Sequence, residues 1–285
     1  MTFAPAVPST SGEDWVEDTR KGKTSMEQVD EVPVTAAPPD RPDIEAMAAT
    51  ATNLTKIYGE GNTQVNALDD VDIGFAAGRL TAIMGPSGSG KSTLLHCMAG
   101  LDSISGGEVR IGDTLISDLS DQELTLLRRQ RMGFIFQAFN LVPTLTAEEN
   151  ILLPLLLGSQ KPDKDWEAEV VDSLGLDERL HHRPEELSGG QQQRVAVARA
   201  LVARPEIIFA DEPTGNLDSK AGQEVLGFLR SAVDRWNQTV VMVTHDPAAA
   251  AHADVVVFLR DGQIVGELPD PTTEMVFEQI NALEA

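Results

Sequence analysis

Nine consecutive residues restrict the possible folds of this chain more than any other feature of its sequence. Residues 85–93 read Gly-Pro-Ser-Gly-Ser-Gly-Lys-Ser-Thr and fit G-x-x-x-x-G-K-[ST], the pattern of a phosphate-binding P-loop. An apolar run at 80–84 precedes the loop, and a helix-compatible run at 94–99 follows it. The sequence therefore predicts a strand–loop–helix unit rather than a flexible Gly/Ser turn. The residues predicted to line the phosphate site are Gly85, Pro86, Ser87, Gly88, Ser89, Gly90, Lys91, Ser92 and Thr93.

The residue types in this loop suit the binding of a nucleotide triphosphate. Glycines allow backbone N–H groups to turn inward around phosphate oxygens, and the following helix presents its positive N-terminus to the same anion. Lys91 supplies a point charge for the terminal phosphates, and the Ser92 hydroxyl can hold Mg²⁺. The loop therefore predicts a site for a nucleotide together with a magnesium ion.

Four apolar runs have the length of strands, at residues 81–84, 207–210, 240–244 and 255–259. They are continuous rather than alternating, as is typical of strands covered on both faces. Helical patterns lie between them, and strands that alternate with helices predict a mostly parallel sheet. Residues 138–190 have fewer strand signals and more helical ones. The expected fold is an α/β P-loop NTPase core with a mostly parallel sheet, an antiparallel β edge and an inserted helical subdomain at about 138–190.

Polar side chains stand where two of these strands end. Asp211 and Glu212 follow the run at 207–210, where Asp211 could bind Mg²⁺ and Glu212 could orient or deprotonate the attacking water. His245 follows the run at 240–244. Taken alone, Asp211 and Glu212 could be solvated carboxylates at a strand end, and His245 could be a structural histidine. Because ligands of open α/β sheets bind outside the carboxyl ends of the strands, we expect all three residues to converge on the P-loop.

Composition separates the first part of the chain from the rest. Residues 1–47 contain ten acidic side chains, from Glu13 to Glu45, against four basic ones, and several prolines. We expect a disordered acidic, Pro-rich tail there and one regular domain over 48–285. The whole chain carries a formal net charge of −23, which disfavours binding to DNA or RNA.

The sequence also bears on the compartment. The single cysteine, Cys97, allows no disulfide within the chain and lies in an apolar stretch, so we expect a buried, inert thiol. No apolar run approaches the roughly 18 residues needed to span a bilayer, and the N-terminus lacks the pattern of a signal peptide. We therefore expect a cytosolic protein unless a partner recruits it to a membrane.

A second glycine motif, Leu187-Ser188-Gly189-Gly190-Gln191, precedes a predicted helix. Serine is a good helix cap, and the glycines expose backbone N–H groups that suit a phosphate. With this motif, the chain resembles the ATPase subunits of ATP-binding cassette (ABC) transporters, whose signature it is. The resemblance extends from about residue 48 to the C-terminus, and it makes ATP the expected nucleotide.

The resemblance implies that two such domains pair head to tail as a homodimer. Each ATP would lie between the P-loop of one copy and the signature of the other, so that Ser188, Gly190 and Gln191 act in trans. The implied roles of single residues are adenine stacking for Tyr58, contact with Mg²⁺ or water for Gln137, coupling of the two sites for Asp218, catalytic base for Glu212 and contact with the terminal phosphate for His245. The expected Mg²⁺ ligands are then Ser92, Gln137 and Asp211, and Lys91 completes the catalytic set.

Several segments resemble one branch of this family, which includes macrolide-export, lipoprotein-release and cell-division ATPases. They lie at 58–68, 136–141, 150–155 and 244–247. This resemblance implies a separate integral membrane permease as partner, and hence a place on the cytoplasmic face of the cell membrane. The apolar run at 151–157 is expected to form a core helix for the most part, with some side chains exposed to receive a helix of the permease.

Two alternatives to export stay open at this point. A soluble ABC ATPase of translation or DNA repair usually carries two cassettes or long coiled coils, whereas this chain has one cassette and no sustained heptads. A regulator that recruits cell-wall or division enzymes through a membrane partner would use the same ATPase residues, so the sequence does not separate it from an exporter.

Overall fold

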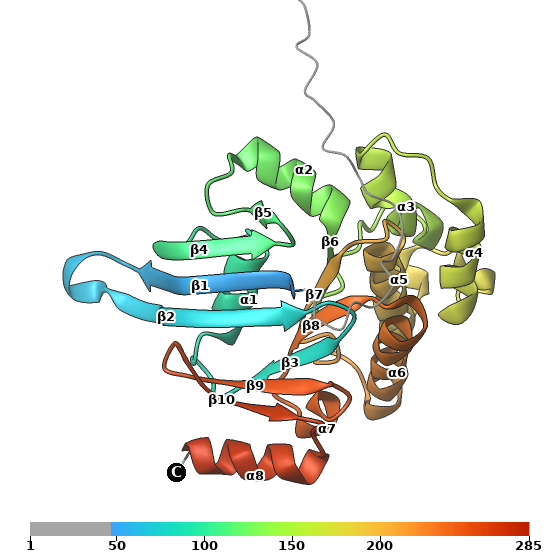
Figure 1. The fold of residues 1–285 in the computed structure, drawn as a ribbon. Helices are drawn as coiled ribbons and strands as arrows, with labels where there is room; N and C mark the ends of the chain where they lie inside the picture. The colour runs from blue at the N-terminus through green and yellow to red at the C-terminus, as the bar shows by residue number, and fades with distance from the viewer. Residues whose placement is uncertain (1–46, 285) are drawn as a thin grey trace, which may run out of the picture. The chain divides into compact units, whose positions relative to one another are not determined.

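The computed structural model describes residues 47–284, and the architecture below concerns this part of the chain. The predicted tail over residues 1–47 lies outside it except for Met47, which begins the first strand. Figure 1 shows two sheets with helices around them. Among the helices of residues 47–284, not one combines the length and the apolar composition that crossing a membrane requires.

The larger sheet contains the strands that the apolar runs predict. Its strands are β3 (Leu80–Met84), β6 (Met132–Phe136), β7 (Ile207–Asp211), β8 (Thr239–Val243), β9 (Val255–Arg260) and β10 (Gln263–Pro269). The order is β10-β9-β3-β8-β7-β6, in which β10 is antiparallel to β9 and the other pairs are parallel. The prediction of a mostly parallel sheet is confirmed.

Both faces of this sheet are covered, which explains why its strands are apolar throughout. Ile208 and Met242 point to a cluster that contains the buried residues of the helices over one face. Their neighbours Phe209 and Val241 point to a second cluster on the other face, which includes Leu94 of the helix after the P-loop. Alternate side chains of one strand therefore belong to different halves of the core.

The predicted antiparallel edge is present in the β9–β10 pair, and further antiparallel strands form a second sheet. A separate four-stranded sheet has the order β2-β1-β4-β5 and consists of β1 (Met47–Tyr58), β2 (Val65–Ala76), β4 (Gly106–Ile111) and β5 (Thr114–Leu115). All of its pairs are antiparallel. The short 3₁₀ helix η1 (Gly61–Thr63) connects β1 to β2. Helix α1 (Lys91–Met98) contacts strands of both sheets and so links them.

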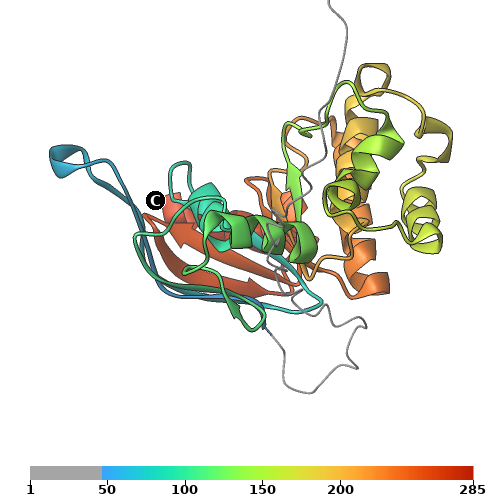
Figure 2. The same cartoon turned by 90° about the horizontal axis from the view of Figure 1, so that it is seen from above.

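The remaining helices fall into two groups. Helices α3 (Ala147–Leu157), α4 (Lys164–Ser173), α5 (Gly189–Leu201) and α6 (Ser219–Trp236) gather on one side of the larger sheet, at the opposite end from the β1–β2 hairpin in both views (Figures 1 and 2). The others are α2 (Asp121–Arg131), α7 (Pro247–Ala250), α8 (Thr273–Glu284), η2 (Asp177–Arg179) and η3 (Pro184–Glu186).

The regular elements between residues 138 and 190 are helical, as the expected inserted subdomain requires. A buried amide holds its entry segment in place. The Asn150 side chain is fully buried, and its Oδ1 accepts from the backbone N–H of Val142 at 2.7 Å. Its Nδ2 donates to the carbonyls of Val142, Leu145 and Thr146 at 2.9 to 3.2 Å. One side chain thus bonds to backbone groups of three residues in the turn before α3.

We expect Asn150→Ala to lower the free energy of unfolding by about 2–4 kcal/mol, because it leaves several buried backbone groups without partners. Denaturant unfolding followed by circular dichroism measures the change. Asn281→Ala on the exposed surface of α8 is the matched control and should change stability by less than about 0.5 kcal/mol. Equal effects of the two substitutions would contradict the anchoring role of Asn150.

Candidate active site

The P-loop follows β3 and packs too tightly for side chains at two of its glycines. A Cβ at Gly85, where φ is 150°, would lie 1.9 Å from the carbonyl oxygen of Leu259. A Cβ at Gly90, where φ is 101°, would lie 2.3 Å from the carbonyl oxygen of Ala67. These positions need glycine because backbone from β9 and β2 approaches the loop directly.

The start of α1 is open to an anion. Its N-cap residue, Gly90, offers no side chain to the first-turn amides, which have no partners within the helix. The Lys91 ammonium donates to the carbonyls of Gly85 and Pro86 at 2.9 and 2.7 Å, so it lies against the loop. Burial lowers the pKa of Lys91, while the nearby carboxylates of Glu212 and Asp211 act in the opposite direction. The arrangement fits a triphosphate, which would take the amides and the ammonium together.

The end of β7 meets the first turn of α1. The Ser92 hydroxyl donates to Asp211 Oδ1 at 3.1 Å. His96 Nε2 lies 3.5 Å from Asp211 Oδ2, and the hydrogen bond with Asp211 raises the pKa of His96 although burial acts to lower it. The sequence analysis did not find His96, although it lies four residues after Ser92 and therefore on the same helix face.

Glu212 and His245 also lie together. His245 Nδ1 is 2.8 Å from Glu212 Oε2, and the Glu212 amide donates to the carbonyl of Val243 at 3.0 Å. Glu212 has a φ of 49°, in the left-handed region that non-glycine residues seldom adopt. Such backbone is often found at functional sites, where the surrounding structure holds it. The expected convergence of strand ends on the P-loop is thus present in the geometry.

Gln137 follows β6 at the same edge of the sheet and is exposed. Its Nε2 donates to Asn216 Oδ1 at 3.3 Å, and Asn216 Nδ2 donates to the Gln137 carbonyl at 2.9 Å. Gln137 is therefore tied to the loop between β7 and α6, and its side chain makes no direct contact with Ser92 or Asp211 among the hydrogen bonds of residues 47–284.

The signature residues form helix caps in this chain. The Ser188 hydroxyl accepts from the Gln191 amide at 3.3 Å, and Gln191 Oε1 accepts from the Ser188 amide at 2.9 Å. Gly190 faces α6, where a Cβ would lie 2.9 Å from that of Ala221. Asp218 accepts from the amides of the first turn of α6 at 3.0 Å. In the part of the chain that the structure describes, no hydrogen bond or ion pair joins these residues to the P-loop.

Tyr58 ends β1 with 41% of its surface exposed. Its hydroxyl donates to Asp102 Oδ2 at 2.5 Å, so the ring is oriented by the segment after α1. Burial first, and then the hydrogen bond to Asp102, raise the pKa of Tyr58.

The oxygen groups at the loop suit a magnesium ion that is bound mainly by substrate phosphates. Ser92 and Asp211 place a hydroxyl and a carboxylate side by side, and Mg²⁺ is commonly held by one or two carboxylates plus phosphate oxygens and water. Residues 47–284 contain no cluster of three or more His, Cys, Asp or Glu side chains that could hold a metal ion.

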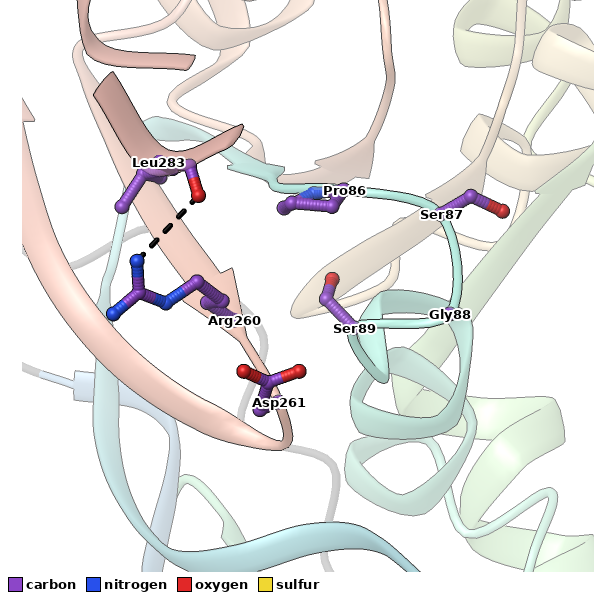
Figure 3. A pocket seen from close by; sticks show the side chains of 7 residues that line it. All are labelled: Pro86, Ser87, Gly88, Ser89, Arg260, Asp261 and Leu283. Carbon is purple, nitrogen blue, oxygen red and sulfur yellow. Dashed lines mark hydrogen bonds between the residues drawn. The ribbon is translucent and has the colours of Figure 1, made fainter. Parts of the chain in front are cut away.

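A pocket of about 430 Å³ adjoins the P-loop and is shown in Figure 3. It lies between residues 86–89, the turn after β9 and the end of α8, where Arg260 Nη1 donates to the Leu283 carbonyl at 3.4 Å. Its lining does not include Lys91, Asp211 or Glu212. We therefore take the cluster at the strand ends, rather than this pocket, as the candidate active site.

Comparison with known proteins shows the family of the chain. The sequence model of the ABC transporter family matches residues 68–215. The chain is 42% identical over 234 residues to the bacitracin export ATP-binding protein BceA of Halalkalibacterium halodurans, which covers 81% of this chain and 92% of that protein. It is 46% identical over 211 residues to the macrolide export ATP-binding/permease protein MacB of Bdellovibrio bacteriovorus, covering 74% of this chain and 32% of that protein.

A solved structure agrees with the fold. The dimeric, post-hydrolysis structure of the ATP-binding cassette MJ0796 of Methanocaldococcus jannaschii, bound to ADP and Pi, superimposes with a TM-score of 0.71 at 41% identity. The match covers 79% of this chain and 99% of that one. From the P-loop geometry, the strand-end cluster and these similarities, we conclude that the chain belongs to the ABC transporter family, as an ATP-binding and ATP-hydrolysing subunit.

Proposed function

We propose that two copies of this chain clamp two ATP molecules and that the cycle of clamping and hydrolysis drives a separate membrane permease. One observation carries the proposal. Lys91, Asp211 and Glu212 lie together at one edge of the sheet, whereas Ser188 on the same chain is exposed and, within residues 47–284, makes no hydrogen bond to them. A second copy can bring its signature to this edge, as the dimeric state of the related cassette MJ0796 also suggests.

The chain's own residues would perform hydrolysis as follows. Lys91 exchanges its two carbonyl partners for oxygens of the terminal phosphates. Glu212 orients the attacking water and accepts its proton, and the contact with His245 keeps the carboxylate in place. Ser92, Asp211 and Gln137 would hold Mg²⁺, which would supply positive charge to neutralise the charge that develops on the phosphoryl group. Closure of the two copies expels water from the site.

The helical subdomain offers a surface for the permease. Ile151 and Leu155 of α3 are buried, but Leu156 and Leu157 are 56% and 62% exposed at its end. A permease helix that packs there would bring the chain to the cytoplasmic face of the cell membrane. The related proteins BceA and MacB are named for export, which favours export or extraction of a substrate as the work performed. We propose no nucleic-acid partner, since the net charge of −23 opposes one.

Glu212→Gln should lower ATP hydrolysis by at least about 100-fold, because the amide cannot accept the proton of the attacking water. The same variant should accumulate as an ATP-bound dimer. Phosphate release and light scattering after gel filtration measure the two effects. Glu274→Gln on the exposed side of α8 is the matched control and should behave like wild type. Wild-type turnover of Glu212→Gln would overturn the role assigned to this carboxylate.

Mixing two inactive variants tests whether the signature acts in trans. Lys91→Met removes the phosphate cation, whereas Ser188→Asp keeps a residue able to cap α5 but places a negative charge where the phosphate would bind. Each variant alone should be inactive. Their mixture should recover up to roughly a quarter of wild-type hydrolysis, because random pairing makes about half the dimers mixed and each mixed dimer holds one intact site. If both motifs act within one chain, the mixture stays inactive.

Leu157→Asp should reduce co-purification of the permease from detergent-solubilised membranes roughly tenfold, because it places a charge in the proposed apolar contact. Basal ATP hydrolysis of the isolated subunit should stay unchanged. Phe277→Asp, at a side chain of similar exposure on α8, is the control and should leave capture intact. Mass spectrometry of the captured proteins also decides between an export permease and a division-type membrane partner, while recovery of ribosomes in place of a membrane protein would contradict the proposal.

A further inference from the structure

Lys56 is a buried lysine that the catalytic mechanism does not use. It lies on β1 with 6% of its surface exposed. Its ammonium donates to Asp102 Oδ1 at 2.7 Å and to the Ser103 carbonyl at 2.5 Å, and the Ser103 hydroxyl lies 3.4 Å away. A buried ammonium needs such partners, so its position is fixed by the segment that follows α1.

The same ammonium lies against the Tyr58 ring. Lys56 and Tyr58 are two residues apart on β1 and so project from the same face of the strand. Lys56 Nζ is 4.7 Å from the ring centroid, a distance at which a cation is attracted to the π-electrons. One side of the ring is therefore in contact with a positive charge, while 41% of the residue's surface stays exposed for a ligand.

Asp102 connects the two side chains. Its Oδ1 accepts from Lys56, and its Oδ2 accepts from the Tyr58 hydroxyl at 2.5 Å. Burial acts to raise the pKa of Asp102, but the hydrogen bonds from Lys56 and Tyr58 outweigh it, and the pKa lies below its usual value. The carboxylate thus stays charged, with one oxygen for the cation and one for the phenol.

Asp102 is also attached to the helix that begins at the P-loop. The amides of Leu101 and Asp102 donate to the His96 carbonyl at 2.8 and 3.3 Å, near the end of α1. Helix α1 therefore presents its first-turn amides at one end and orients the Tyr58 ring through Asp102 at the other. The distance between the phosphate site and the ring is set by one rigid element.

We propose that Lys56 and Asp102 are positioning residues that hold Tyr58 as a stacking platform for the adenine base. Asp102 fixes the tilt of the ring through the hydroxyl. Lys56 draws electron density toward the far face, which strengthens stacking of an electron-rich purine on the near face. The inference rests on the proposed function of Tyr58 as the adenine contact.

Binding of two probes separates this role from a merely structural one. Affinities of the full chain for ATP and for inorganic triphosphate, both with Mg²⁺, are measured by calorimetry. Lys56→Met keeps the length of the side chain and removes its charge, so ATP affinity should fall roughly threefold to tenfold while triphosphate affinity stays unchanged. Lys56→Arg restores the cation and should recover most of the ATP affinity. Lys161→Met in the exposed loop before α4 is the matched control.

Tyr58→Ala distinguishes failure of this inference from failure of the proposed function. It should lower ATP affinity roughly tenfold or more with no effect on triphosphate, since stacking on an aromatic side chain acts on the base alone. Equal losses for both probes, or none, would remove Tyr58 from the adenine site and the inference with it. Tyr58→Ala could lose affinity for ATP alone while Lys56→Met loses affinity for both probes equally or for neither. That result would support the adenine site and overturn the positioning role of Lys56.

A second pair of variants keeps the test decisive if Lys56→Met does not fold. Asp102→Asn retains one oxygen that can accept a hydrogen bond but removes the negative charge. Tyr58→Phe keeps the ring and removes the hydroxyl that donates to Asp102. Both should show smaller but still ATP-selective losses, and a wild-type ratio of ATP to triphosphate affinity in both would contradict the proposal. Lys56→Met in the Tyr58→Ala background should cause no additional selective loss, because the cation then has no ring to act on.

Discussion

The parallel strands of the larger sheet end at one edge, and the active site depends on this alignment. In the register of the sheet, Asp211 pairs with Val243 on the next strand, and Ile83 of the P-loop strand pairs with the same valine on its other side. The pairing of the strands therefore brings the residues that follow them to one edge of the sheet. The register of these strands fixes where each one ends. Asp211 and Glu212 therefore lie beside Ser92 without a long network of side-chain contacts.

Helix α1 connects the phosphate site to the hydrophobic core of the domain. Its buried face, with Leu94, Leu95 and Met98, packs into the cluster shared by the two sheets. Burial of each such side chain contributes about 1.5–3 kcal/mol. The unpartnered amides at the start of α1 are thus supported by packing farther along the same helix. A phosphate site can stay open without loss of the fold because its rigidity comes from the core.

The sequence predicted those parts of the fold that depend on local apolar runs. The runs at 207–210 and 240–244 correspond to β7 (Ile207–Asp211) and β8 (Thr239–Val243), with ends that differ by one residue. The sequence predicted an antiparallel edge but not the bounds and register of the four-stranded antiparallel sheet, because its strands alternate buried and exposed side chains. Polar residues such as Asp70 and Asp72 interrupt the apolar pattern of β2. Its register depends on pairing between segments that are distant along the chain.

In the candidate site, too, some residues could be predicted from the sequence and others could not. Motif spacing predicted that Lys91, Asp211, Glu212 and His245 converge, and the structure places them together, although their roles stay predictions. Asp102 could not be found in this way, because its importance comes from two neighbours that lie more than forty residues away along the chain. The structure confirms Ser188 as a helix cap and adds a capping role for Asp218, which aspartate commonly has at helix starts.

The signature helix is bound to the Gln137 segment by side chains rather than by the sheet. The fully buried Gln193 donates to the Pro213 carbonyl at 2.5 Å and to the Phe136 carbonyl at 3.5 Å. Arg199, whose pKa is lowered by burial, donates to the carbonyls of Phe139 and Asn140 at 2.8 and 2.6 Å. A movement of the segment after β6 would break these bonds unless α5 moved with it. In the proposed cycle, a permease that shifts α3 or the Gln137 segment would therefore displace the glycines at the start of α5, which are the groups offered to the second copy's ATP.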